Sequence, residues 1–207
     1  MYFDPREDAR PEPLSHNPFN ALVAPRPIAW VTSIDSESRI NLAPFSFYNA
    51  ISSDPPYVMF ALGPKDKAGT PKDTLANVRQ VPEFVISVAS WELRKAVNQT
   101  SKAYSADINE FERAGLTQVA SQQVKPPRVG EAKAALECRV SQIIELPGKS
   151  DSRNRHMVIG EVVGIFIDDE VIENGMVVAG RLHQLSRLGY FEYDQVEDTF
   201  TMPRPEG

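Results

Sequence analysis

The pattern of apolar and polar positions along the chain predicts mostly short β-strands. Six runs of β-branched and aromatic residues are separated by polar or proline-containing stretches, as strands are in a series of hairpins. They lie at 28–34, 39–42, 57–62, 84–90, 134–144 and 156–168. In the last run, Gly160 and Gly164 are spaced as if to allow sharp coiling or close approach by another group.

Helical spacing is confined to short segments between these runs. Asp73 or Thr74 is the predicted N-cap of one helix, which Pro82 ends. A second helix is predicted with Asp107 as its N-cap and Gly115 as its terminator. Because strands outnumber helices and follow one another as hairpins, the pattern favours a mainly β, mostly antiparallel barrel with peripheral helices over a doubly wound sheet.

Proline divides the chain into an arm and a body. Six of the 17 prolines fall within the first 27 residues, and we interpret residues 1–24 as an N-terminal arm that lies on another surface, such as a second subunit. No linker or internal repeat interrupts residues 25–190. Residues 25–207 are therefore predicted to form a single domain, which is large enough to bury its own core.

Composition and charge narrow the class of partner. The single cysteine, Cys138, excludes an internal disulfide and favours a reducing, cytoplasmic environment. The N-terminal stretch has acids and prolines where a signal peptide has an apolar core, and no run of roughly eighteen apolar residues occurs, so no membrane is expected. The net charge of −6 argues against nucleic acid, whose phosphates bind clustered lysines and arginines. A small-molecule partner is expected instead.

Several catalytic motifs are missing from the sequence. There is no G-x-G-x-x-G after a strand, no Walker loop, no G-x-S-x-G and no H-E-x-x-H. The three histidines, His16, His156 and His183, are scattered, and with one cysteine they build no zinc-ligand spacing. These absences disfavour a hydrolase or a metalloenzyme, and no metal is predicted.

The stretch NLAPFSFYNAISSDPP, residues 41–56, interrupts the predicted sheet with groups that form hydrogen bonds. Pro44 has no N–H for a ladder, so it must lie at an edge, a bulge or a strand end, and Ala43 is small enough for a flat ring to approach the main chain. Nearby hydroxyl groups belong to Ser46, Ser52, Ser53, Thr32 and Ser33. Two interpretations stay open: a cradle for a planar ligand with a hydroxylated tail, or a proline-broken loop whose serines bond to their own backbone.

Two further features of the sequence also allow two interpretations each. Lys72, Thr74 and Asn77 at a helix start form either a phosphate site or an ordinary capped helix N-terminus. His156 heads the longest predicted strand and is either a catalytic group or a structural one.

Several segments, taken together and in order, resemble the flavin reductase-like family of FMN-binding split barrels. They are RPIAWVTSID, NLAPFSFYNAISSDPPYVMFALG, KDTLANVRQVPEFVISV, VKPPRV, ALECRVSQIIELPG and HMVIGEVVGIFIDD, and they extend from about residue 24 to about residue 204. The most specific part is N-x-A-P-x-S-x-x-x-x-x-S-x-D-P-P. The resemblance implies a six-stranded antiparallel split β-barrel, a homodimer, and FMN held in a groove at the dimer interface.

The resemblance also implies a set of cofactor-binding residues. Those expected along the isoalloxazine and ribityl chain are Thr32, Asn41, Ala43, Pro44, Phe45, Ser46 and Phe47. Those expected at the ribityl or phosphate end are Ser52, Lys72, Thr74 and Asn77.

The sequence departs from the family at one place. The shorter flavin reductases of two-component monooxygenases often carry G-D-H before the equivalent of VIGEV, with the histidine near the nicotinamide. Here the residues are Asn154-Arg155-His156, and His156 is one residue closer to the glycine. Such a shift changes the face of a strand, so either Arg155 or His156 faces the flavin. His156 is the predicted catalytic residue.

The resemblance implies an FMN-binding oxidoreductase. The expected activity is reduction of FMN by hydride transfer, with NADH or NADPH as reductant, and the reduced flavin then serves a partner monooxygenase or a bound acceptor. Arg155, His156 or Arg181 is the candidate for holding the charge of the nicotinamide or substrate. The alternatives are reduction of a small aromatic acceptor, such as a nitroarene or quinone, and a non-catalytic electron carrier of the flavoredoxin type.

Overall fold

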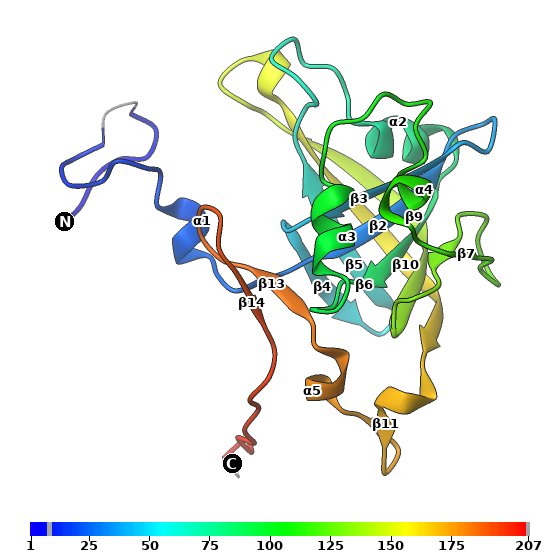
Figure 1. The fold of residues 1–207 in the computed structure, drawn as a ribbon. Coiled ribbons are helices and arrows are strands. Elements are labelled where there is room, and N and C mark those ends of the chain that lie inside the picture. Colours follow the sequence, from blue (N-terminus) through cyan, green and yellow to red (C-terminus); the bar gives the residue numbers. More distant parts are fainter. Residues whose placement is uncertain (8–9, 206–207) are drawn as a thin grey trace.

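The computed structural model describes residues 1–7 and 10–205 and contains one large antiparallel sheet (Figure 1). Seven strands follow one another in the order β3-β2-β6-β9-β10-β5-β4. They are β2 (Ala29–Ile34), β3 (Ile40–Phe45), β4 (Tyr48–Ser53), β5 (Pro56–Leu62), β6 (Glu83–Val88), β9 (Ala134–Leu146) and β10 (Arg155–Ile167). Each of the six predicted apolar runs contributes to one of these strands.

The sheet curls, and its two edge strands adjoin at one corner without pairing with each other. Its edge strands, β3 and β4, are consecutive in the chain and are joined by Ser46 and Phe47. At this junction the Ala61 N–H of β5 donates to the Phe47 carbonyl at 2.8 Å. The sheet has seven strands rather than the predicted six, because residues 40–53 form two strands that pair with different neighbours, β2 and β5.

The remaining elements are short and peripheral. The α-helices are α1 (Phe19–Leu22), α2 (Asp73–Gln80), α3 (Arg94–Gln99), α4 (Glu110–Ala114) and α5 (Ala179–Leu182), with 3-10 turns at Asp151–Arg153 and Asp169–Val171. The short strands are β1 (Arg26–Pro27), β7 (Gln118–Val119), β8 (Arg128–Val129), β11 (Ile172–Glu173), β12 (Met176–Val177), β13 (Leu185–Arg187) and β14 (Tyr193–Gln195). The predicted class, mainly β with peripheral helices, is confirmed.

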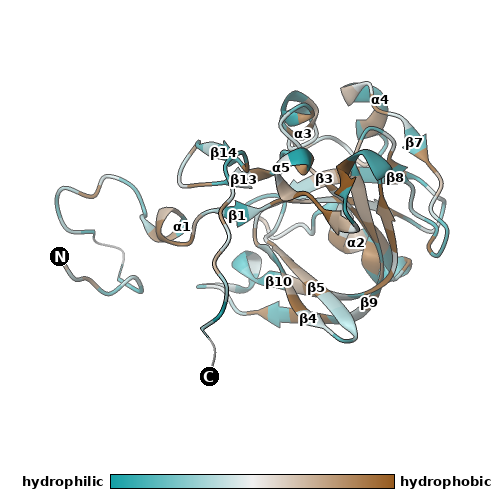
Figure 2. Ribbon diagram, turned by 90° about the horizontal axis from the view of Figure 1, so that it is seen from below, coloured by the Kyte–Doolittle hydropathy of each residue, from teal (hydrophilic) through white to brown (hydrophobic). Residues whose placement is uncertain are grey.

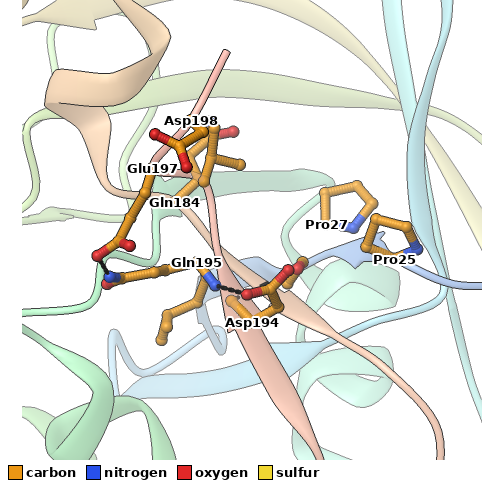
Figure 3. Close-up of a pocket in the computed structure, with 10 residues that line it drawn as sticks. Pro25, Pro27, Gln184, Asp194, Gln195, Glu197 and Asp198 are labelled. Atoms are coloured by element: carbon orange, nitrogen blue, oxygen red, sulfur yellow. Dashed lines mark hydrogen bonds between the residues drawn. The ribbon is translucent and has the colours of Figure 1, made fainter.

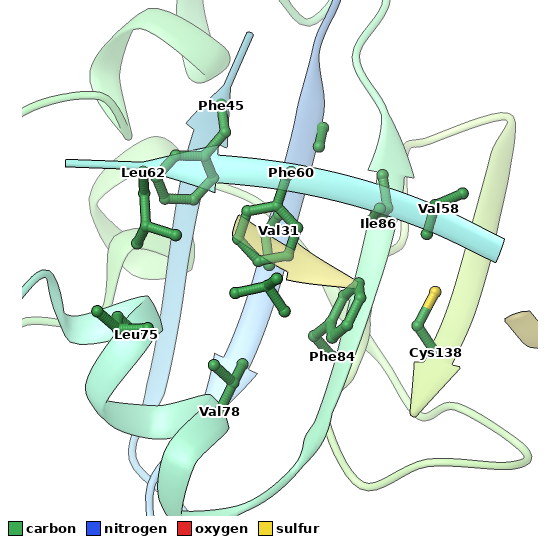
Figure 4. Packing of buried hydrophobic residues seen from close by; sticks show 12 residues of the cluster. Val31, Phe45, Val58, Phe60, Leu62, Leu75, Val78, Phe84, Ile86 and Cys138 are labelled. Atoms are coloured by element: carbon green, nitrogen blue, oxygen red, sulfur yellow. The ribbon is translucent and has the colours of Figure 1, made fainter. Parts of the chain in front are cut away.

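Aromatic side chains fill the barrel interior (Figure 4). The ring centroids of Phe45 and Phe60 lie 5.3 Å apart, and those of Phe60 and Phe84 also lie 5.3 Å apart. Helix α2 adds Leu75 and Val78 to the same buried cluster, so the helix is held by the core of the barrel.

The outer face of β2 and β3 is buried as well. Trp30 and Leu42 pack there with Val97 of α3 and Phe111 of α4, and the Trp30 Nε1–H donates to Thr100 Oγ1 at 2.9 Å. In Figure 2 the most hydrophobic segments lie on the barrel strands. Strand β2 therefore separates two apolar clusters, with the barrel interior on one side and α3 and α4 on the other.

The helix ends differ from the prediction. The N-cap of α2 is Lys72, without a side-chain hydrogen bond, so neither Asp73 nor Thr74 caps the helix. The N-cap of α4 is Asn109 rather than Asp107, because the Asn109 side chain accepts from Phe111 N at 3.0 Å. The predicted terminator Gly115 is confirmed, since it has a φ of 66° in the left-handed region.

The N-terminal and C-terminal segments meet beside the barrel (Figure 1). Strand β1 pairs with β13, and β13 pairs with β14, in a small separate sheet. The buried Arg26 side chain donates to the carbonyls of Asn20, Val23 and Leu188 and so ties α1 to the β13–β14 hairpin. Within the described residues, no helix has the length and apolar character needed to cross a membrane.

Gly160 of β10 is required by the packing of the core. A Cβ at this position would lie 2.4 Å from Phe84 Cζ, which confirms the predicted close approach to this glycine. Replacing Gly160 by alanine is expected to lower the free energy of unfolding by about 1–3 kcal/mol, because overpacking forces side chains and backbone to shift. Denaturant unfolding followed by circular dichroism measures the change.

The matched control is Gly180→Ala in α5, where a Cβ would approach Glu197 O no closer than 3.4 Å. This variant is expected to be as stable as the parent. Phe84→Leu in the Gly160→Ala background should recover part of the lost stability. A Gly160→Ala protein with parental stability would contradict the close packing.

Candidate functional site

The exposed edge of β3 forms one wall of the candidate site. In an antiparallel pair, residues alternate between those that bond to the neighbouring strand and those that point away from it. The Leu42 N–H points away from β2 and donates to Glu110 Oε2 at 3.0 Å. Pro44 lies two residues on and has the same direction, so its missing N–H removes no ladder bond. Of the three predicted places for Pro44, an edge, a bulge or a strand end, the structure shows the edge.

A small cavity of about 50 Å³ lies against this edge. Six of the predicted cofactor-binding residues line it, namely Asn41, Ala43, Pro44, Phe45, Lys72 and Thr74. The other lining residues are Lys65, Asp73, Thr100, Ser101, Lys102, Ala103, Tyr104 and Glu110. A volume of this size has room for roughly three or four water molecules, which is comparable to the oxygens of a phosphate group.

The N-terminus of α2 opens into this cavity without a cap of its own. Lys72 is the N-cap residue in an extended conformation and makes no side-chain cap, and no side chain among the described residues accepts from the first helical N–H groups. The Thr74 hydroxyl, which could have capped the helix, instead accepts from Asn41 Nδ2 at 2.9 Å. This bond joins α2 to β3 and leaves the helix N-terminus free to bind an anion.

The charges around the cavity favour an anionic group. Asp73 would oppose one, but its carboxylate is paired with Lys65 Nζ at 2.8 Å. Lys72 has no hydrogen bond or ion pair with any residue that the structure describes, and Lys102 Nζ lies 5.3 Å from the centroid of the Tyr104 ring. Burial raises the pKa of Glu110, although the Leu42 N–H opposes the shift. The positive charges of Lys72 and Lys102 are thus only partly offset by acidic groups at the cavity.

Three predicted residues lie elsewhere. Thr32 is on the face of β2 opposite to Asn41, since side chains alternate along a strand, and its buried Oγ1 has no hydrogen-bond partner among the described residues. Ser52 is exposed on β4, at the other edge of the sheet. Asn77 is turned toward β2, where Nδ2 donates to Ser33 Oγ at 3.2 Å. None of the three lines the cavity.

Ser46 and Phe47 continue the β3 edge beyond the cavity. The Phe47 ring is contacted by two guanidinium groups, with Arg26 Cζ 5.7 Å and Arg155 Cζ 5.8 Å from its centroid. Ser46 and Phe47 are partly buried and extend the wall beyond the residues that line the cavity.

Of the two residues at the start of β10, Arg155 faces this wall. His156 points the other way, with Nε2 at 2.9 Å from Arg79 Nη2 and 3.3 Å from Glu145 Oε2. The structure does not bring His156, the predicted catalytic residue, to the cavity or to Phe47. The physical reason is the alternation of faces along β10, which the one-residue shift in the sequence had left open.

Sequence reasoning missed Lys65, Lys102 and Tyr104. Each lies in a loop or at the end of a loop. Their separation from β3 along the chain follows no helix or strand period. The only available signal was the concentration of lysines in KDKAGTPK, next to the predicted helix start.

A larger cavity of about 510 Å³ lies elsewhere, between β1 and the C-terminal segment (Figure 3). Its walls include Pro25 and Pro27 on one side and Asp194, Glu197 and Asp198 on the other. It contains none of the predicted site residues, and its three carboxylates oppose an anionic ligand.

Known proteins share both this sequence and this fold. The family described as "Flavin reductase like domain" matches residues 22–186. An uncharacterized protein of Halalkalibacterium halodurans is 38% identical over 183 residues, which are 88% of this chain and 87% of that protein.

Two solved structures are similar over most of their length. Nitrilotriacetate monooxygenase component B from Bacillus cereus is 30% identical, covers 98% of each chain and superposes with a TM-score of 0.88. The 2-nitrobenzoate 2-nitroreductase NbaA of Pseudomonas fluorescens is 29% identical, covers 90% of this chain and 88% of its own, and gives a TM-score of 0.79. With the family match spanning most of the chain, the protein belongs to the flavin reductase-like family.

Proposed function

We propose that this protein is an FMN-dependent oxidoreductase that reduces the flavin with NADH or NADPH. The observation that carries the proposal is the convergence of the β3 edge, the uncapped N-terminus of α2 and several lysines on one cavity. When bound, FMN supplies the hydride and electron transfer. The residues of this chain bind it, orient it and shield it from water.

The donor set suits the two ends of FMN. Lys72 and the free N–H groups at the start of α2 match a phosphate, and the cavity has room for one. Ala43 and Pro44, with no bulky side chain at the β3 edge, allow a flat ring to lie along the main chain toward Phe47. The expected roles of Thr32, Ser52 and Asn77 lose support, and the remaining predicted residues are proposed as cofactor ligands.

The similarity to a monooxygenase component supports a role in delivering reduced flavin to a partner oxygenase. The similarity to NbaA favours a second candidate, direct reduction of a small nitroaromatic acceptor. Because the sequence has no G-x-G-x-x-G motif, a nicotinamide must be bound at the flavin site itself rather than in a domain of its own.

A homodimer is proposed as the functional form. Strand β4 presents an exposed, unpaired edge, and large apolar side chains are exposed beside the barrel, including Phe19, Leu22 and Phe191. Apolar exposure of this kind marks an interaction surface. We therefore propose that residues 1–24 form an arm that packs on the second subunit, and that residues 25–207 form the FMN-binding domain. A cytoplasmic location stays a prediction from the single cysteine.

Anaerobic titration tests the proposed reaction. The protein loaded with FMN is expected to lose its visible flavin absorbance on addition of NADH or NADPH. Persistence of the oxidised spectrum with both reductants would leave the electron-carrier alternative and refute the reductase. Turnover of a nitroaromatic by bound FMN, without added free flavin, would favour the second candidate.

Replacing Lys72 by alanine is expected to weaken FMN binding by roughly tenfold or more, because a charged hydrogen bond to phosphate is lost. Riboflavin, which has no phosphate, should bind the variant as it binds the parent. Fluorescence titration gives both affinities. The matched control is Lys67→Ala, which removes the same charge from an exposed loop residue outside the cavity. Equal weakening of both ligands would refute a phosphate contact at Lys72.

Charged substitutions at Leu22 and Phe191 test the dimer. These side chains are 79% and 91% exposed, and aspartate at both positions is expected to convert a dimer into a monomer, because the charges would be buried at the interface. Light scattering after size exclusion measures the mass. Met176→Asp, at a 68% exposed position on β12, should remain dimeric. A parent protein that elutes as a monomer at micromolar concentration would refute the proposal.

A further inference from the structure

Arg155 is held at one defined place beside the candidate site. Its guanidinium lies over the Phe47 ring, with Cζ 5.8 Å from the centroid. It also fills the space left by Gly63, since a Cβ at that glycine would lie 3.0 Å from Arg155 Nη1. Gly63 is two residues before Lys65, which lines the cavity. The Arg155 head group therefore contacts two residues, Gly63 and Phe47, that each lie two positions along the chain from a residue that lines the cavity.

The charge of Arg155 is uncompensated. Its side chain is exposed, and it makes no hydrogen bond or ion pair with any residue that the structure describes. The nearby acid on the paired strand, Glu145, is on the other face, where it accepts from Asn154 Nδ2 at 3.0 Å and lies 3.3 Å from His156 Nε2. Contact with a ring face uses none of the five N–H donors of a guanidinium, so all of them stay available to a ligand.

The Phe47 ring beneath Arg155 is also fixed by contact with a second arginine. Arg26 also lies over Phe47, at 5.7 Å, but its guanidinium is occupied by the carbonyls of Asn20, Val23 and Leu188. Arg26 is 7% exposed and is not available to a ligand. Arg26 Nε has no hydrogen-bond partner among the described residues but is buried, so of the two arginines at Phe47 only Arg155 has exposed donors that a ligand can reach.

We propose that Arg155 determines specificity by binding the anionic group of the second substrate, a carboxylate or phosphate on an organic molecule that enters over Phe47. The inference rests on the proposed function, because it places this substrate beside the flavin. A guanidinium binds both anions through paired N–H donors, and its position over a ring reduces the conformational freedom that binding would cost. The anion comes either from the nicotinamide reductant or from the acceptor.

Calorimetric titration tests the proposal without relying on turnover. The probes are NADP⁺ and benzoate, with uncharged nicotinamide and benzamide as their counterparts, and FMN is titrated separately into each protein. Arg155→Ala is expected to weaken binding of at least one anion by roughly ten- to a hundredfold, while the neutral probes are unaffected. Arg155→Lys should be intermediate, because it keeps the charge and loses the paired donors.

Arg153→Ala is the matched control, since Arg153 is an exposed arginine of the 3-10 turn that precedes β10 and has no contact with Phe47. It should bind every probe as the parent does. A response to NADP⁺ assigns the anion to the reductant, and a response to benzoate assigns it to the acceptor.

Two results would overturn the role of Arg155: a parent that binds neither anion more tightly than its neutral counterpart, or an Arg155→Ala protein that binds both anions as the parent does. Failure of the parent to bind FMN is a different result, and it overturns the proposed function.

Discussion

The missing N–H of Pro44 is the constraint on which the site depends. A residue with an N–H at this position would offer β3 a complete edge, ready to pair with another strand. With proline there, the edge stays open, and the neighbouring Leu42 N–H is satisfied by the Glu110 carboxylate instead. That contact fixes the start of α4 against β3 and explains why an acid is buried beside a cavity that favours anions. Burial raises the pKa of this carboxyl, while the bond from the Leu42 N–H opposes the shift.

The net charge of the residues around the cavity differs in sign from the net charge of the whole chain. The protein carries −6 overall, which on its own would repel a phosphate. At the cavity, however, the Asp73 carboxylate is paired with Lys65, and Lys72 has no acidic partner among the described residues. Short-range interactions of this kind decide binding, because charges more than about 8–10 Å away are screened by physiological salt.

Much of the fold was predictable from the sequence, because its determinants are local. Period and residue type locate the strands, and the chemistry of proline limits Pro44 to an edge, a bulge or a strand end. The side of the sheet to which a residue points was harder to predict, since the alternation of faces can be read from the sequence only when one face is polar. Trp30 and Val31 are both fully buried, so the residues of β2 do not indicate that Thr32 lies on the face opposite to Asn41.

The same limit applies to the start of β10 and to the loops. Arg155 and His156 are both polar, and only the pairing of β10 with its neighbours shows which one turns toward Phe47. Lys102 and Tyr104 reach the cavity through α3, whose position depends on packing against Trp30 rather than on any spacing from β3. Contacts between distant parts of the chain are the information that a single sequence does not display.

Arg26 links the proposed arm to the proposed flavin site. Its guanidinium binds the carbonyls of Asn20 and Val23 in the arm and lies over the Phe47 ring at the end of the β3 edge. Since these contacts share one buried side chain, a movement of the arm must displace either the guanidinium or the ring. An arm that packs on a second subunit would therefore hold Phe47, and with it the surface beneath Arg155, in a fixed position. The proposed dimer and the proposed substrate site would in this way depend on the same contact.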